Sequence, residues 1–230
     1  MIQFSNLVKK YKGIQVLEVE NLTVTAGSCF GLVGNNGAGK TTLFSVLLDL
    51  VQPTEGYVVN KEIRVNQSED WKTHTTAFID ESFLIGYLTP EEYFEFIGQA
   101  RQSPKTEWQK VLETLQPFFN GTVLGQNKYI RDMSKGNQKK VGLAAAFFGN
   151  PELIVLDEPF ANLDPSSQIQ LKKFIALQKQ KGITFLISSH DLSHVTEICE
   201  RIVLLEKGKP IKDIETSPST LKELESYFAA

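Results

Sequence analysis

The chain has 230 residues, of which 41% are hydrophobic and 22% are charged, and its formal net charge is −3. This length and apolar content are sufficient for one globular domain with a sizeable core, and the mildly acidic balance disfavours non-specific nucleic-acid binding. No run of residues approaches the ~18 apolar positions of a membrane-spanning helix, and the first residues lack the apolar region of a secretory signal.

Strands are predicted in the first third of the chain by the alternation of apolar and polar residues and by β-branched content. The predicted strands are residues 2–8, about 15–24, 56–66 and 74–80. A short apolar run over residues 29–33 then leads into a Gly-rich turn, and residues 41–50 predict a helix that directly follows this turn.

Helices dominate the middle of the chain, and the predicted ones are residues 90–100, 104–120 and 135–149. The first of them has a complete start signal, because Thr89 is suited to the N-cap, Pro90 to the first helical position and Glu92 to closing a capping box. Since few strand signals lie between these helices, we predict that residues of about 82–149 form a helical insert packed beside a sheet.

The last third of the chain returns to alternating strands and helices. Residues 152–159 and 183–189 are continuous apolar runs, which suit buried parallel strands, and an amphipathic helix that ends at Gly182 lies between them. A hairpin is predicted over residues 202–213, turning at Lys207-Gly208, and a short helix over residues 217–228. This order predicts an α/β fold with a mostly parallel sheet, interrupted by the helical insert.

The Gly-rich turn has the sequence GNNGAGKT over residues 34–41, which matches the phosphate-loop pattern G-x-x-x-x-G-K-T between a strand and a helix. Its glycines let backbone N–H groups point at phosphates. We expect Lys40 to lie near the β- and γ-phosphates of a nucleotide, Thr41 to offer its hydroxyl to Mg²⁺, and Thr42 to face the α-phosphate. An ordinary Gly-rich strand-to-helix turn is the alternative.

Two adjacent carboxylates end the buried run LIVLDE. Asp157 is placed to reach Mg²⁺ through water, and Glu158 to act on an attacking water. Acidic strand ends are common, so this pair is a weak signal alone. Together with a phosphate loop it indicates metal-assisted hydrolysis of a nucleotide.

A second possible anion site lies in MSKGNQKK, residues 133–140. Ser134 is suited to cap a helix, and Gly136 leaves the backbone open to an anion. The alternative is a well-capped helix start without a ligand. Two anion sites for one expected nucleotide suggest a symmetric pair of chains that uses every site.

The segments GNNGAGKTT, MSKGNQ, LIVLDEP, ANLD and SSH occur in this order, and from Tyr11 to about Asp213 the chain resembles the nucleotide-binding subunits of ATP-binding-cassette (ABC) transporters. The resemblance implies one ATPase domain over residues 1–230. Its P-loop NTPase core would span about 1–81 and 150–230, with an N-terminal antiparallel β subdomain and the α-helical insert. ATP and Mg²⁺ would be the cofactors, and ATP would contact Gly34, Asn35, Asn36, Gly37, Ala38, Gly39, Lys40, Thr41 and Thr42.

The resemblance also implies roles for single residues. Ser134 and Gly136 would contact the γ-phosphate of an ATP held by a second subunit, which packs head to tail against the first. Tyr11 would stack on adenine, although surface packing is an alternative. His190 would contact the γ-phosphate and join Glu158 in catalysis. Asp164 would cross to the partner subunit, cap a helix, or both.

The chain departs from the family pattern at several positions. The Gln that the family uses at Mg²⁺ is absent, and Glu81 aligns best with it, with Asp80 as the alternative. Lys135 and Asn137 replace the usual Gly and Gln of the signature motif, which resembles export-type single-domain ATPases. The basic run over residues 135–140 is predicted to be a solvated helix face.

An aromatic segment follows the predicted Mg²⁺ ligand. By resemblance a membrane subunit would dock here, whereas the alternative is that these rings fill the core of the helical insert. The residues concerned are Phe83, Tyr87, Tyr93, Phe94 and Phe96.

These observations predict an ATP-hydrolysing subunit that energises a membrane transporter, with export as the expected direction. Its expected partners are a second nucleotide-binding subunit, identical or related, and membrane-spanning permease subunits, but no nucleic acid. The expected location is the cytoplasmic face of the cell membrane. The alternatives are a soluble ABC-type ATPase that acts on a macromolecular machine, and a regulatory module that binds ATP without hydrolysis.

Overall fold

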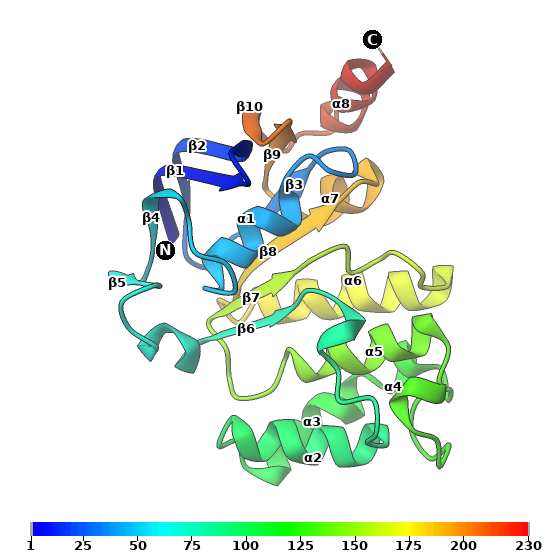
Figure 1. Cartoon of the computed structure of the whole chain (residues 1–230). Helices are drawn as coiled ribbons and strands as arrows, with labels where there is room; N and C mark the ends of the chain where they lie inside the picture. Colours follow the sequence, from blue (N-terminus) through cyan, green and yellow to red (C-terminus); the bar gives the residue numbers. More distant parts are fainter. Residues whose placement is uncertain (1, 230) are drawn as a thin grey trace.

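Two β-sheets organise the computed structural model, which describes residues 2–229 (Figure 1). The smaller sheet is antiparallel, and its strand order is β2 (Ile14–Val24), β1 (Ile2–Tyr11), β4 (Glu55–Asn60) and β5 (Ile63–Arg64). The single strand predicted over residues 56–66 is therefore two strands. They are separated by Lys61 and Glu62, which both have positive φ, as a tight hairpin turn requires.

The larger sheet has the order β10 (Lys209–Glu215), β9 (Arg201–Glu206), β3 (Cys29–Val33), β8 (Thr184–Ser189), β7 (Leu153–Leu156) and β6 (Thr75–Phe78). All neighbouring pairs are parallel except β9 and β10, which form the predicted hairpin at Lys207-Gly208. Every residue of β3, β7 and β8 is buried, because helices or the small sheet cover both faces. The mostly parallel α/β fold class is confirmed.

Helices connect the strands of the larger sheet and form the insert. The α-helices are α1 (Lys40–Leu47), α2 (Pro90–Ala100), α3 (Lys105–Thr114), α4 (Gln116–Phe119), α5 (Lys135–Ala145), α6 (Pro165–Lys179), α7 (Leu192–Ile198) and α8 (Thr220–Ala229). The short 3₁₀ helices are η1 (Asp70–Thr73), η2 (Glu81–Phe83) and η3 (Ile130–Asp132). The sequence did not predict α7, which has only 7 residues.

Local signals explain where two of these helices begin. The capping box of α2 is complete, since the Thr89 hydroxyl accepts from the Glu92 N–H at 3.3 Å and the Glu92 carboxylate accepts from the Thr89 N–H at 2.8 Å. The helix predicted over residues 104–120 is instead broken into α3 and α4 at Leu115. Pro117, two residues further along, has no N–H to continue the hydrogen-bond ladder of α3.

Two hydrophobic cores lie on opposite faces of the larger sheet. One contains α1 and the inner face of the small sheet, and the other contains α6 and the helices of the insert. Stacked and tilted rings, among them Phe94, Trp108 and Phe148, fill the core of the insert. Figure 1 shows α2 to α5 gathered at the end of the molecule far from the small sheet.

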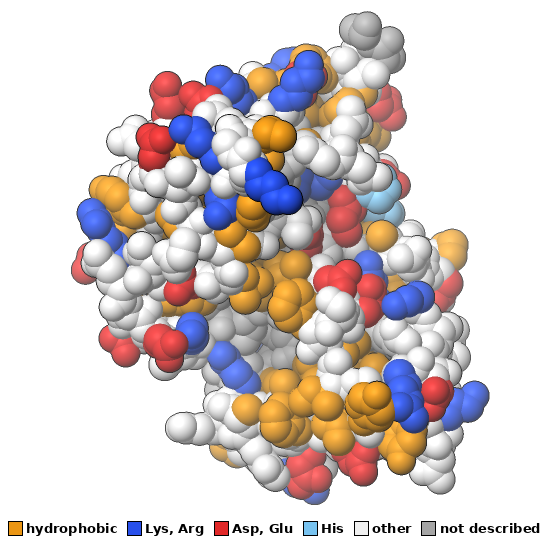
Figure 2. Space-filling model, viewed as in Figure 1, with side chains coloured by type: hydrophobic (Ala, Val, Ile, Leu, Met, Phe, Trp, Pro, Cys, Tyr) orange, Lys and Arg blue, Asp and Glu red, His pale blue; other side chains and the backbone are white. Residues whose placement is uncertain are grey.

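The aromatic segment after β6 divides between the two interpretations of its role. Tyr93 and Phe94 are buried in the insert, whereas Phe83, Tyr87 and Phe96 are 62%, 72% and 48% exposed. Figure 2 shows hydrophobic side chains gathered over the insert and in the hollow above it. None of the helices within residues 2–229 is long and apolar enough to cross a membrane.

The prediction of a solvated basic face over residues 135–140 is wrong for two of its lysines. Lys139 and Lys140 are only 5% and 3% exposed. The reason is that α5 lies inside the molecule, where the Lys139 ammonium is 3.5 Å from the Glu81 carboxylate and the Lys140 ammonium 3.3 Å from that of Asp164. Carboxylates from other segments of the chain therefore compensate the energetic cost of burying these two ammonium groups.

Candidate functional site

The predicted phosphate loop connects β3 to α1 and lies against the carboxyl end of β9, at Leu205. A Cβ atom on Gly34 would be 2.3 Å from the Leu205 carbonyl oxygen, so only glycine fits there. Gly39, the N-cap of α1, has φ +106, and its Cβ would be 3.1 Å from the Val16 carbonyl oxygen. These close approaches fix the loop at the N-terminus of α1, where backbone N–H groups are free for an anion.

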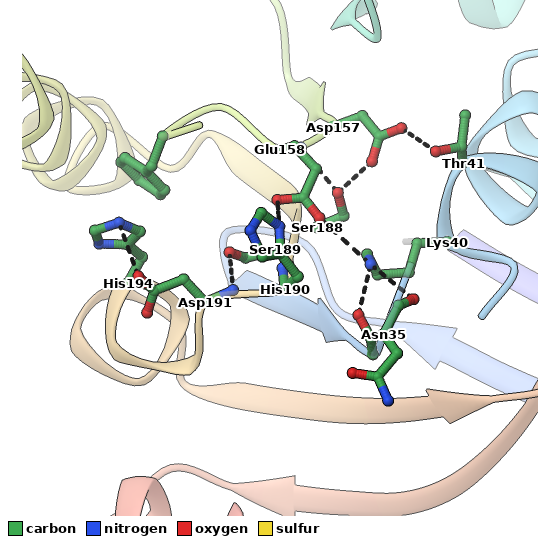
Figure 3. A network of polar contacts seen from close by, with 12 residues as sticks. Asn35, Lys40, Thr41, Asp157, Glu158, Ser188, Ser189, His190, Asp191 and His194 are labelled. Carbon is green, nitrogen blue, oxygen red and sulfur yellow. Dashed lines mark hydrogen bonds and ion pairs between the residues drawn. The ribbon is translucent and has the colours of Figure 1, made fainter. Parts of the chain in front are cut away.

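Lys40 lies inside this loop and is only 6% exposed. Its ammonium donates to the Gly34 carbonyl at 2.6 Å and to the Asn35 carbonyl at 3.4 Å. It also lies 3.3 Å from Oε1 of Glu158, although this oxygen accepts no hydrogen bond of good geometry. Figure 3 shows the ammonium between the loop and the carboxylate. The cation is thus placed where phosphate oxygens would enter the loop.

Asp157 directly follows β7 and is buried. The Thr41 hydroxyl donates to its Oδ2 at 2.5 Å, and the Ser188 hydroxyl donates to its Oδ1. Burial raises the pKa of Asp157, and the two donated hydrogen bonds oppose this rise. Ser188 is a residue that the sequence analysis missed, since SSH was used there only to locate His190.

Glu158 has a left-handed backbone, with φ +47, which is unfavourable for a residue other than glycine. Its N–H donates to Ser188 Oγ at 2.9 Å, and its carbonyl accepts from Lys139 Nζ at 2.9 Å. Its Oε2 lies 2.8 Å from Nδ1 of His190 and 3.3 Å from the His190 backbone N–H. The carboxylate is therefore held between His190 on one side and Lys40 on the other (Figure 3).

Glu81 and Asp80 lie at the start of η2, and the structure separates their roles. Asp80 caps η2, accepting from the Ser82 N–H at 2.7 Å, and its pKa is lowered mainly by hydrogen bonds from Ser82. Glu81 points inward, because its side chain is 13% exposed and its Oε1 lies 3.5 Å from Lys139 without a hydrogen bond. This geometry favours Glu81 over Asp80 as the residue that faces the site.

The second predicted anion site lies at the N-terminus of α5. The Ser134 hydroxyl accepts from the Asn137 N–H at 3.3 Å, so it caps the helix. A Cβ on Gly136 would lie 2.8 Å from the Asn162 carbonyl oxygen, which leaves no room for a side chain. Within residues 2–229, no hydrogen bond or ion pair connects Ser134 or Gly136 to the phosphate loop.

Asp164 has a clear structural role as the N-cap of α6. Its Oδ1 accepts from the Ser167 N–H at 2.9 Å and from the Ser166 hydroxyl at 2.6 Å. These hydrogen bonds, first that of Ser166, hold the pKa of Asp164 far below its usual range. Its other oxygen accepts from the Ser167 hydroxyl and lies 3.3 Å from Lys140. The prediction of helix capping is confirmed by this geometry.

The remaining predicted binding residues lie at the open side of the loop. Asn35, Asn36 and Gly37 form its exposed tip, and Thr42 is half-buried on α1. Tyr11, the last residue of β1, is 44% exposed, and the Lys9 ammonium lies 4.7 Å from the centre of its ring. The ring is thus accessible to a planar ligand.

The oxygen atoms of the site fit Mg²⁺ that arrives with a nucleotide. Thr41 and Asp157 offer a hydroxyl and a carboxylate, and Glu81 has a buried oxygen without a hydrogen bond. In the part of the chain that the structure describes, no group of three or more His, Cys, Asp and Glu side chains can hold a metal by itself. Mg²⁺ in nucleotide sites takes one or two carboxylates together with phosphate oxygens, and the adjacent Thr41 hydroxyl and Asp157 carboxylate fit this pattern.

Comparison with known proteins agrees with this geometry. The ABC transporter family matches residues 17–161. YhaQ of Bacillus subtilis, an uncharacterized ABC transporter ATP-binding protein, is 33% identical over 228 residues, covering 99% of this chain and 74% of that protein. A dimeric post-hydrolysis state of the ATP-binding cassette MJ0796, bound to ADP and Pi, has a TM-score of 0.80 and 26% identity, covering 94% of this chain and 99% of that one.

Relatives named for export and for import both match. LptB of Haemophilus influenzae, a lipopolysaccharide export system ATP-binding protein, is 31% identical, covering 90% of this chain and 87% of that protein. MetN of Carboxydothermus hydrogenoformans, a methionine import ATP-binding protein, is 28% identical, covering 93% of this chain and 66% of that protein. What these proteins share is ATP binding for transport. The chain belongs to the ABC transporter family, as an ATP-binding subunit with the ATPase activity that powers transport.

Proposed function

We propose that this subunit binds ATP with Mg²⁺, closes head to tail on a second nucleotide-binding subunit, and thereby drives export through a membrane-spanning partner. One observation carries the proposal. The phosphate loop, the end of β7 and the end of β8 bring Lys40, Asp157, Glu158 and His190 together, whereas within residues 2–229 no hydrogen bond or ion pair joins Ser134 at the second anion site to this group. The whole chain acts as one ATPase domain, with the core meeting the insert near residues 81 and 150.

Glu158 is the residue proposed to activate water. Its Oε2 is oriented by His190 at 2.8 Å, and its Oε1 lies 3.3 Å from Lys40. When phosphate oxygens attract the Lys40 ammonium, Oε1 becomes free to accept a proton from water. A positioned general base contributes ~10²–10⁴-fold to such a reaction. His190, whose side chain is 52% exposed, would contact the γ-phosphate as well.

Mg²⁺ is proposed to be held by the Thr41 hydroxyl, by Asp157 and by Glu81. When bound, it neutralises charge on the β- and γ-phosphates. The hydrogen bonds from Thr41 and Ser188 support this assignment, because they orient both oxygens of Asp157. Thr42 would face the α-phosphate, and the exposed ring of Tyr11 would stack on adenine.

The second subunit is proposed to complete the site. Ser134 and Gly136 would contact the γ-phosphate of ATP bound to the partner, and the segment before Asp164 would cross to that partner. The closeness of Gly136 to the Asn162 carbonyl supports this, since the two segments form one surface. The partner is a second copy of this chain or a related subunit. The dimeric form of the similar cassette MJ0796 agrees with the scheme.

A groove between the core and the insert is proposed as the docking site for the membrane-spanning partner on the cytoplasmic face. Its volume is about 390 Å³. Phe83, at its edge, is 62% exposed. The groove is lined mainly by apolar side chains, among them Leu48, Trp71, Phe78, Phe83, Tyr93 and Ile97.

The direction of transport is proposed to be export, which Lys135 and Asn137 in the signature motif favour. The direction can be measured as ATP-dependent movement of substrate in vesicles that contain both this subunit and the membrane-spanning subunit.

The variant Glu158→Gln tests the proposed chemistry. We expect ATP hydrolysis to fall by at least ~10²-fold, because the amide cannot accept the proton, while ATP binding persists. ATP should then increase the dimeric fraction in size-exclusion chromatography. Glu152→Gln is the matched control, since Glu152 lies at the opposite end of β7 and its carboxylate pairs with exposed Lys61. Hydrolysis by Glu158→Gln at the rate of this control would contradict the assigned role.

A further inference from the structure

Lys139 is a buried cation that connects the helical insert to the hydrolysis site. It lies on α5, and its side chain is 7% exposed. Its ammonium donates to the carbonyl of Glu158 at 2.9 Å and lies 3.5 Å from the Glu81 carboxylate. One ammonium on α5 therefore contacts both the segment after β6 and the segment after β7.

The charge of Lys139 is matched by that of Glu81. The Glu81 side chain is 13% exposed, and its Oε1 accepts no hydrogen bond. Within residues 2–229, Lys139 supplies the cationic nitrogen that lies within 4.0 Å of this carboxylate, and no second Lys, Arg or His nitrogen does so. A buried charge without a partner is strongly unfavourable, whereas removal of both members of a buried pair is often tolerated. The two residues thus form one electrostatic unit inside the molecule.

The backbone of Glu158 needs external support. Its φ of +47 lies in the left-handed region, which is strained for a residue with a Cβ. The N–H of Glu158 donates to Ser188 on β8, and its carbonyl accepts from Lys139 on α5 at 2.9 Å and from the Ala161 N–H at 3.3 Å. Two of these three contacts come from side chains, one from the sheet and one from the insert. Lys139 is thus the contact that connects the Glu158 backbone to the insert.

We propose that Lys139 is a positioning residue for ATP hydrolysis. Balanced by Glu81, its ammonium holds the Glu158 carbonyl, and through it the carboxylate between His190 and Lys40. This inference rests on the proposed role of Glu158. Because Lys139 belongs to the insert and Glu81 to η2, a shift of either segment changes the orientation of Glu158.

Three variants of the purified subunit separate positioning from charge balance. Lys139→Met removes both the hydrogen bond and the charge. We expect kcat for ATP hydrolysis to fall between about 10-fold and 100-fold, as for loss of one charge-assisted hydrogen bond, while KM for ATP changes less than about 3-fold. Lys139→Arg can still donate to the carbonyl and should retain most of kcat. The double variant Glu81→Gln with Lys139→Met restores charge balance but not the hydrogen bond.

The double variant is the decisive measurement. We expect its Tm to return toward the wild-type value, because no buried charge is left unpaired. Glu81 is also a proposed Mg²⁺ ligand, so kcat of the double variant is compared with that of Glu81→Gln alone and should be lower by the same factor of about 10 to 100 that Lys139→Met loses against wild type. A double variant as active as Glu81→Gln would overturn the proposal, since Lys139 would then only balance charge. Wild-type kcat in Lys139→Met would overturn it as well, as would a rise in KM that accounts for the whole loss.

A surface lysine provides the control. Lys61 forms an exposed ion pair with Glu152 at the end of the sheet away from the site, so Lys61→Met should change neither kcat nor Tm appreciably. The variant Glu158→Gln distinguishes failure of this inference from failure of the proposed function. If that variant hydrolyses ATP normally, the role of Glu158 is wrong. If it is inactive and Lys139→Met is fully active, only the positioning role is wrong.

Discussion

Ser188 is the residue whose removal we expect to affect both stability and the hydrolysis site. It is completely buried on β8, and its hydroxyl makes two hydrogen bonds at once. It donates to the carboxylate of Asp157 and accepts from the N–H of Glu158. The variant Ser188→Ala leaves a buried carboxylate oxygen and a half-buried N–H without these partners.

The size of the effect follows from the two bonds. A hydrogen bond to a charged group contributes about 1.5–3 kcal/mol and one between neutral groups about 0.5–1.5 kcal/mol. We therefore expect Ser188→Ala to lower the free energy of unfolding by ~3 kcal/mol. For a chain of this length, that corresponds to a decrease in Tm of roughly 6–12 °C. A loss of this size is a large fraction of the stability of a typical domain, which is about 5–15 kcal/mol.

The free energy of unfolding that Ser188→Ala loses should be larger at neutral pH than in acid. Burial raises the pKa of Asp157 in the folded protein above its value in the unfolded chain. The folded protein therefore loses stability as pH rises from the unfolded pKa through the folded pKa, because the buried carboxyl group ionises. Removal of the Ser188 hydroxyl takes a hydrogen bond from the ionised form and raises this folded pKa further. The difference between wild type and Ser188→Ala should therefore be larger at pH 7 than below about pH 4, near the unfolded pKa.

The matched control is the next residue along the strand. Ser189 is 2% exposed, and its hydroxyl makes one hydrogen bond, accepting from the Asp191 N–H at 3.0 Å. Ser189→Ala should cost only ~1 kcal/mol. Both variants are compared by urea and thermal unfolding at pH 7 and at acidic pH. If Ser188→Ala is no less stable than Ser189→Ala, the reasoning about the two buried bonds is refuted.

Two further variants test the packing and capping around the site. Asp164→Ala should cost at least ~1 kcal/mol, because it removes the α6 cap and leaves the buried ammonium of Lys140 without the carboxylate that lies 3.3 Å from it. Since hydrogen bonds lower the pKa of Asp164, this difference should be full above about pH 4 and shrink in stronger acid, and a constant difference in urea unfolding would contradict it. Gly98→Ala adds a helix-favouring residue worth ~1 kcal/mol, but its Cβ would lie 2.4 Å from Nε1 of Trp108, which is stacked on Phe148. Overpacking of about 1–3 kcal/mol should outweigh the gain, so an increase in Tm would show that the ring can move.

Short-range signals in the chain were sufficient for much of the fold. The predicted helix over residues 90–100 matches α2 at both ends, because its cap, its proline and its apolar spacing are all local. The hairpin at Lys207-Gly208 follows in the same way from a two-residue turn that needs positive φ. The phosphate loop is contiguous in sequence, so its residues were identified together. The strands β3, β7 and β8 were evident as uninterrupted apolar runs.

Contacts between distant segments decided the rest. The residues next to Lys139 in the sequence predict that its side chain is exposed to solvent, since a charged side chain on a helix is normally exposed. Only the position of α5 beside η2 and β7 gives it the Glu81 carboxylate and the Glu158 carbonyl as partners. Ser188 likewise gains its role because β8 lies next to β7 in the sheet.

The division between the two kinds of information has a physical cause. Backbone propensity, capping and loop geometry depend on residues a few positions apart, and these are written next to each other in the chain. The burial of a charge depends on whether a counter-charge lies within a few ångströms, which the fold alone determines. Sequence therefore predicted which residues contact the phosphates, while the tertiary structure determined which side chains hold Asp157 and Glu158 in place.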